Sequence, residues 1–117
     1  MGAESRSQDA EVLNITPVEL KRRLELDEKG LFLLDVREPF EYEICRIEGS
    51  TLMPMSELWG RIELLDPSKE IVVICHAGVR SAIVASWLRC RGFTKVLNLK
   101  GGIDEWAATV DPAMPRY

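Results

Sequence analysis

Two short runs of apolar residues constrain the fold of this chain more than any other feature. Residues 31–36 (LFLLDV) are apolar at all but one position, and residues 71–74 (IVVI) are four consecutive β-branched residues. Runs of this kind are typical of strands that are buried on both faces, as in a parallel sheet covered by helices. The two runs therefore predict the centre of an α/β fold.

The segments around these strands carry helix signals. Thr16 is a candidate N-cap, followed by Pro17 and then by Glu19, and this capping-box pattern predicts a helix over 17–28 that ends before Gly30. Further helices are predicted over 39–44, 56–65, 81–91 and 103–108, and further strands over 12–15, 50–53 and 95–99. Five short strands that alternate with helices predict an α/β sandwich around a mostly parallel sheet.

The helix predicted over 81–91 has its apolar side chains at helical spacing. Ile83, Trp87 and Cys90 fall on one face, so this face is expected to pack against the core. Ser81 stands at the start of the helix, where a serine side chain is a favourable N-cap. Cys90 is therefore expected to be a core residue.

Length and charge limit the remaining choices. The 117 residues suit one domain, expected over 11–117, behind a polar N-terminal tail over 1–10. The net charge of −4 argues against a partner such as nucleic acid or an anionic membrane, which requires a basic surface. No apolar run approaches the roughly 20 residues of a membrane span, and the first residues lack the apolar segment of a secretory signal.

The cysteines indicate a reducing compartment. Cys45, Cys75 and Cys90 are odd in number and form no CxxC pair, which argues against a disulfide framework. The chain has one histidine, so neither a structural zinc site nor another metal site is expected. We accordingly expect a cytoplasmic protein without a cofactor.

Cys75 occupies the position with the clearest chemical meaning. It directly follows the run at 71–74, and ligands gather at the carboxyl ends of parallel strands. The loop Cys75-His76-Ala77-Gly78-Val79-Arg80-Ser81 leads straight into a helix. Its backbone N–H groups can point at the sulfur, with Gly78 permitting a positive φ, and the helix N-terminus favours an anion there. These features favour a reactive thiolate, and Cys75 is the predicted nucleophile.

These segments resemble the rhodanese family. CHAGVRS is similar to its active-site loop, LLDVREPFEYEICRIEGS to the segment before that loop, and VLNLKGGIDEW to its closing strand and helix. The resemblance covers roughly residues 11–107. Glu48 stands where the family often has proline, and Cys45 where glycine or a polar residue is common; both lie outside the loop.

The resemblance implies a three-layer rhodanese-like sandwich with a five-stranded, mostly parallel sheet, and a thiosulfate sulfurtransferase that works through a Cys75 persulfide. The donor would be thiosulfate or another persulfide donor, and the acceptor cyanide, a thiol or a sulfur-carrier protein. Arg80 would bind the sulfonate end of the donor or brace the loop, and Asp35 and Arg37 are expected to brace the loop. The remaining substrate-binding residues are expected to be His76, Ala77, Gly78, Val79 and Ser81.

Three alternatives remain at this point. The first is a phosphatase or arsenate reductase, although only four residues separate Cys75 from Arg80, a loop that suits one sulfur atom better than a phosphate. The second is a non-catalytic binding module, whose relatives usually lack the cysteine or break its loop. The third concerns context: residues 110–117 (VDPAMPRY) resemble the tail of rhodanese domains fused behind adenylyltransferases, so a free-standing enzyme and such a domain are both open.

Overall fold

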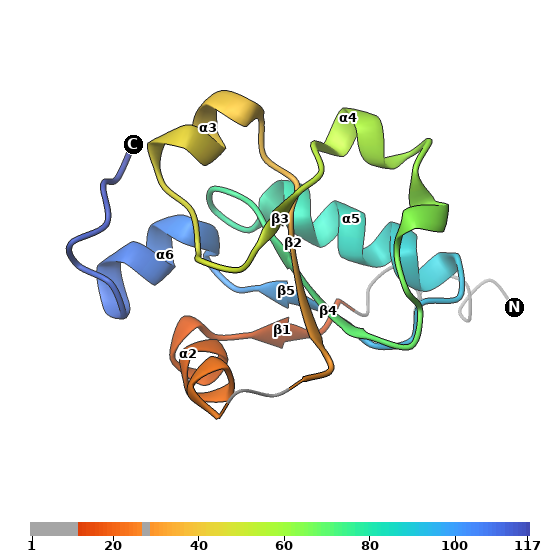
Figure 1. The fold of residues 1–117 in the computed structure, drawn as a ribbon, viewed down its shortest axis with the longest axis horizontal. Coiled ribbons are helices and arrows are strands. Elements are labelled where there is room, and N and C mark those ends of the chain that lie inside the picture. The colour runs from red at the N-terminus through yellow and green to blue at the C-terminus, as the bar shows by residue number, and fades with distance from the viewer. Residues whose placement is uncertain (1–11, 27–28) are drawn as a thin grey trace, which may run out of the picture.

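A single parallel sheet forms the centre of the molecule. The computed structural model describes residues 12–26 and 29–117, so the tail expected over 1–10 and the predicted end of the first helix lie outside the described residues. The strands are arranged in the order β1-β5-β4-β2-β3, and every neighbouring pair is parallel. Their bounds are β1 Asn14–Ile15, β2 Leu31–Asp35, β3 Thr51–Leu52, β4 Glu70–Ile74 and β5 Val96–Leu99. The predicted α/β sandwich is confirmed (Figure 1).

Helices connect the strands and cover both faces of the sheet. They are α2 Pro17–Glu25, α3 Pro39–Ile44, α4 Met55–Leu58, α5 Val79–Cys90 and α6 Gly102–Thr109, with a short 3-10 turn over Ile62–Leu64. The predicted capping box starts α2: Glu19 N donates to Thr16 Oγ1 at 3.1 Å, and Thr16 N donates to Glu19 Oε1 at 2.9 Å. In the part of the chain that the structure describes, no helix is long and apolar enough to cross a membrane.

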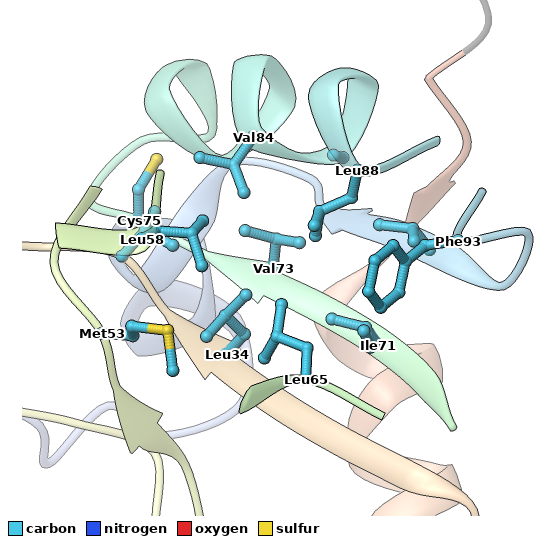
Figure 2. Packing of buried hydrophobic residues seen from close by; sticks show 13 residues of the cluster. Leu34, Met53, Leu58, Leu65, Ile71, Val73, Cys75, Val84, Leu88 and Phe93 are labelled. Atoms are coloured by element: carbon cyan, nitrogen blue, oxygen red, sulfur yellow. The ribbon is translucent and has the colours of Figure 1, made fainter. Parts of the chain in front are cut away.

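Side chains alternate between two cores along each central strand. In β4, Ile71 and Val73 belong to the core under α4 and α5, which Figure 2 shows from close by, whereas Val72 and Ile74 belong to the core on the opposite face. The second core also contains Leu20 of α2 and two residues of α6. Both faces of the strands are covered, which explains why β2 and β4 are apolar at almost every position.

The prediction for the buried face of α5 is wrong for Ile83 and Cys90, whereas Trp87 is partly buried and packs against the core. Ile83 is 51% exposed and Cys90 is exposed, so Cys90 is not a core residue. The buried residues of the helix are instead Ser81, Val84, Ala85 and Leu88. Ser81 is held against the Cys75 sulfur at the end of β4. The residues three, four and seven positions after Ser81 lie on the same side of the helix and pack in the core.

The helix predicted over 56–65 is also wrong, because the structure breaks it into two pieces. The helix α4 begins after Pro54 rather than at Ser56 and ends at Leu58, before Gly60. Glycine in a helix interior costs about 1 kcal/mol relative to alanine, so Gly60 disfavours a continuous helix through this segment. The two pieces instead bury Leu58 and Leu65 in the core below α5.

Candidate active site

The sulfur of Cys75 lies at the N-terminus of α5. Cys75 is the first residue after β4 and is only 1% exposed. Figure 2 shows its side chain pointing toward the start of the helix, beside Leu58. Gly78 N donates to the Cys75 sulfur at 3.1 Å, and Ser81 N donates to it at 3.3 Å. Ser81 is the third residue of the helix, so the sulfur accepts one of the N–H groups that an N-capping side chain usually accepts, together with the N–H of Gly78.

This arrangement corrects the expected role of Ser81 as a helix cap. The N-cap position of α5 belongs to Gly78, whose φ of 97° lies in the left-handed region that glycine adopts without strain. Ser81 lies within the first turn of the helix, and its side chain is turned toward the sulfur. Two N–H donors and the positive end of a 12-residue helix together stabilise negative charge on the sulfur. The geometry thus suits a thiolate or a persulfide anion.

The N-terminus of α6 holds the backbone of the cysteine loop. Ile103 N donates to the Cys75 carbonyl at 2.8 Å, and Asp104 N donates to the His76 carbonyl at 2.9 Å. Gly102 makes this close approach possible, because a Cβ atom there would lie 2.4 Å from the His76 carbonyl oxygen. Its φ is also positive, at 66°. Gly102, the first residue of α6, is therefore part of the support for the cysteine loop.

A chain of polar side chains runs from the buried sulfur through Ser81 and Asn98 to the exposed Asn14 of the first strand. The Ser81 hydroxyl lies 3.2 Å from the Cys75 sulfur and donates to Asn98 Oδ1. Asn98 Nδ2 donates to Asn14 Oδ1 at 3.0 Å and to the Gly78 carbonyl at 3.4 Å. Asn98 is 5% exposed and comes from β5, the strand next to β4. The chain therefore connects the side chain of Cys75 to two other strands of the sheet.

Arg80 is bound to a carboxylate of α3. Its guanidinium donates to Glu41 Oε1 at 2.8 Å and to Glu41 Oε2 at 2.9 Å. These bonds from Arg80 hold the pKa of Glu41 at about 2, well below its ordinary value of 4.5. They also raise the pKa of Arg80. Bidentate pairing of this kind fixes the direction of the guanidinium as well as its charge.

Asp35 and Arg37, the predicted loop-bracing pair, form a buried ion pair behind α3. Arg37 is fully buried, donates from Nε and NH2 to the Asp35 carboxylate, and also donates to the carbonyls of Glu41 and Cys45. Burial alone would lower the pKa of Arg37, but its bonds to Asp35 and Tyr117 raise that pKa above the ordinary value. The hydrogen bonds of Arg37 connect this pair to α3 and to the C-terminal segment. Glu41 of α3 is in turn connected to the cysteine loop by its bonds with Arg80.

Tyr117 joins these groups from the end of the chain. Its hydroxyl donates to Glu41 Oε2 at 2.9 Å and accepts from Arg37 NH1, also at 2.9 Å. Burial raises the pKa of Tyr117 to about 12, so the hydroxyl remains protonated. Its ring lies 4.3 Å from the ring of His76, centroid to centroid. The C-terminal segment therefore forms one wall beside the loop.

The other loop residues lie around the Cys75 sulfur on its solvent side. His76 Nδ1 is buried and has no hydrogen-bond partner among the described residues. Ala77 is exposed, and Val79 is 69% exposed. Together with Gly78, Arg80 and Ser81, these residues are brought around Cys75 by the strand-to-helix turn.

Four residues that contact the site were not predicted from the sequence: Glu41, Asn98, Gly102 and Tyr117. A polar residue inside the apolar run VLNL was a usable signal for Asn98, because a polar side chain inside a central strand needs a buried partner. Nothing local to Tyr117 or Glu41 indicates their contacts, which depend on how the C-terminal segment and α3 pack.

Comparison with known proteins agrees with this geometry. A family model described as "Rhodanese-like domain" matches residues 16–109. The chain is 36% identical over 102 residues to "Putative sulfurtransferase YtwF" of Bacillus subtilis, covering 87% of this chain and 97% of that protein. It is 37% identical over 117 residues to "Probable adenylyltransferase/sulfurtransferase MoeZ" of Mycobacterium tuberculosis, covering 98% of this chain and 30% of that protein.

The solved structures lead to the same family. A rhodanese-related protein from Thermoplasma volcanium has a TM-score of 0.75 and 32% identity, over 84% of this chain and 93% of that one. Several relatives are longer than the region they share with this chain, which spans between 30% and 60% of the length of three of them. The names of the relatives support a role in sulfur transfer.

Proposed function

This chain belongs to the rhodanese-like family, and from that premise we propose that it is a sulfurtransferase that carries sulfur as a persulfide on Cys75. The observation that carries the proposal is the Cys75 sulfur itself, which accepts two backbone N–H groups at the N-terminus of α5. Such a sulfur is stabilised as an anion, and a thiolate is the nucleophilic form of cysteine. The names of the relatives support the same reaction class.

The reaction has two half-reactions. In the first, the Cys75 thiolate attacks the outer sulfur of thiosulfate or of another persulfide donor, a sulfur–sulfur bond forms on Cys75, and sulfite or the donor thiolate leaves. In the second, an acceptor nucleophile takes the terminal sulfur, and the Cys75 thiolate returns. The N–H groups of Gly78 and Ser81 stabilise the Cys75 thiolate, which attacks in the first step and leaves in the second, as an oxyanion hole stabilises an oxygen anion.

The proposed acceptors are cyanide, a thiol or a sulfur-carrier protein. Relatives named "Putative sulfur carrier protein YrkF" and "Probable adenylyltransferase/sulfurtransferase MoeZ" support a protein partner of this kind. The proposed compartment is the cytoplasm, because all three cysteines are free thiols and a reducing compartment keeps them so.

The loop geometry disfavours the phosphatase alternative. A phosphatase needs an arginine and a ring of free N–H groups directed at the phosphate, whereas Arg80 is bound to Glu41 and two loop N–H groups are bound to the sulfur. A non-catalytic module is disfavoured because the cysteine and its loop are intact. The loop size is testable: a glycine inserted beside Gly78 should move the N–H groups away from the sulfur and abolish sulfur transfer.

Mass spectrometry of the intact protein tests the proposal. After treatment with a sulfane donor, wild type and the Cys45→Ser and Cys90→Ser variants should each gain one sulfur atom, and addition of cyanide should remove it with release of thiocyanate. The Cys75→Ser variant should gain none. Sulfur loading that persists in Cys75→Ser, or hydrolysis of an aryl phosphate by wild type without any sulfur loading, would refute the proposal.

A further inference from the structure

The hydrogen bonds of Asn98 determine which way the Ser81 hydroxyl can point. Asn98 Nδ2 faces two acceptors, Asn14 Oδ1 at 3.0 Å and the Gly78 carbonyl at 3.4 Å. The amide is therefore oriented with Oδ1 toward Ser81, and a rotated amide would bring two oxygens together at Gly78. Since Oδ1 can only accept, the Ser81 hydroxyl must donate its one hydrogen to Asn98.

A hydroxyl group that already donates to Asn98 can only accept from Cys75. The Ser81 oxygen lies 3.2 Å from the Cys75 sulfur, so the bond between them is made by the thiol S–H. This bond exists only while the thiol is protonated. When the thiol ionises, its proton leaves to solvent. The Ser81 hydroxyl then either turns its hydrogen from Asn98 to the sulfur, or keeps its bond to Asn98 and directs an oxygen lone pair at the sulfur anion, which repels it.

That rotation carries a cost at Asn98. The residue is 5% exposed, so its Oδ1 cannot take a replacement bond from bulk water. Leaving a buried acceptor without a partner costs more free energy than an ordinary hydrogen bond contributes. We propose that Asn98 is a positioning residue that, through the Ser81 hydroxyl, opposes ionisation of Cys75 and so counteracts the two N–H groups that favour the thiolate.

The consequence concerns the two states of the proposed reaction. In the persulfide the Cys75 sulfur bears no hydrogen, and the charge lies on the terminal sulfur. Ser81 can then keep its bond to Asn98 while the N–H groups of Gly78 and Ser81 face the sulfur. The pair therefore opposes the free thiolate but not the loaded persulfide, which protects an unloaded cysteine from alkylation and oxidation. This consequence rests on the proposed function; the orientation of the hydroxyl does not.

Alkylation of Cys75 across a range of pH tests the inference without any sulfur donor. The Asn98→Leu variant keeps a branched side chain of similar size but offers no acceptor to Ser81. The pH midpoint of alkylation by iodoacetamide should then fall by about one unit, as expected when a charge-assisted hydrogen bond to the thiolate becomes available. Peptide mapping assigns the modified cysteine, and cysteine-to-serine changes at Cys45 and Cys90 remove the background.

A double-mutant cycle separates this role from a structural one. In a Ser81→Ala background the Asn98→Leu change should leave the midpoint where it is. A shift of the same size in that background, or no shift when Ser81 is present, would overturn the inference. The titratable side chains around the loop are the same in every variant, and they are Asp35, Arg37, Glu41, His76, Arg80, Asp104, Arg116 and Tyr117.

A second measurement is made on the wild-type chain and so does not depend on how the Asn98 and Ser81 variants fold. Below the alkylation midpoint, the Raman S–H stretch of Cys75 should lie below that of an unbonded thiol, because its hydrogen is donated to Ser81. The band is assigned by its loss in Cys75→Ser. A Cys75 band at the frequency of an unbonded thiol would contradict the inference even if sulfur transfer is normal, whereas failed sulfur loading with a shifted band would refute only the proposed function.

Discussion

Arg80 and Glu41 are joined by two hydrogen bonds of 2.8 and 2.9 Å, although they lie 39 residues apart in the chain. Glu41 is buried and also accepts from the Tyr117 hydroxyl. The guanidinium expected to bind the sulfonate of a donor is thus already paired with a carboxylate. An anionic donor such as thiosulfate has to compete with that carboxylate, whereas a donor without a sulfonate group does not.

The pairing predicts opposite effects of two substitutions on thiosulfate. Arg80→Ala should raise the KM for thiosulfate, because no guanidinium remains. Glu41→Gln should lower that KM by about tenfold, because Arg80 loses its charged partner and can pair with the donor. Initial rates of thiocyanate formation measure both, and a polysulfide donor without a sulfonate group serves as the control. Equal changes for both donors would assign Arg80 a purely structural role.

The same pair predicts a dependence of stability on acid. The pKa of Glu41 is about 2 in the folded protein and about 4.5 when unfolded, so the folded state binds the proton less tightly. Glu41 therefore contributes stability that is present above pH 4.5 and is lost as the pH falls toward 2. The free energy of unfolding, measured in urea at each pH, should fall less steeply over this window in Glu41→Gln than in wild type. Identical slopes would show that the pair adds no pH dependence.

Removal of the Tyr117 hydroxyl should destabilise the protein. In Tyr117→Phe, Arg37 NH1 loses one acceptor and Glu41 loses one donor, at a cost of about 1–3 kcal/mol. Arg116→Gln is the matched control on the same segment, because it breaks an exposed ion pair with Asp104, and such pairs contribute little. Urea unfolding of the two variants should show a clear loss in the first and little change in the second. A similar change in both would mean that the Tyr117 hydroxyl contributes no more than a surface contact.

Two glycines with positive φ should differ sharply when replaced by alanine. Gly49 has a φ of 89° and open space around its missing Cβ, so Gly49→Ala should cost only backbone strain, about 1–2 kcal/mol. Gly102→Ala adds an overlap with the carbonyls of Cys75 and His76, at 2.6 and 2.4 Å. It should therefore lower stability further and reduce sulfur loading of Cys75, measured by mass. Normal loading in a folded Gly102→Ala variant would show that α6 does not set the loop geometry.

The class of fold, and the position of Cys75 at the end of a buried strand, could both be predicted from the sequence. The apolar runs that became β2 and β4 are readable because burial on both faces leaves a continuous pattern in neighbouring residues. The start of α2 was readable because its capping box involves only Thr16 and Glu19. The cysteine loop was readable for the same reason, since its residues are consecutive and connect a strand directly to a helix.

The contacts around the cysteine loop could not be predicted from the sequence, because they depend on how distant elements pack. The rotation of α5 is one example, because apolar residues occur on both sides of the helix: Ile83, Trp87 and Cys90 on the predicted face, and Val84, Ala85 and Leu88 on the buried one. The partners of Arg80 and Asn98 come from other elements, Glu41 on α3 and Asn14 on β1. Sequence patterns report forces between residues close in the chain, whereas these contacts depend on strand order and on helix packing across the sheet. That packing brings Tyr117 within hydrogen-bonding distance of Glu41, 76 residues earlier in the chain.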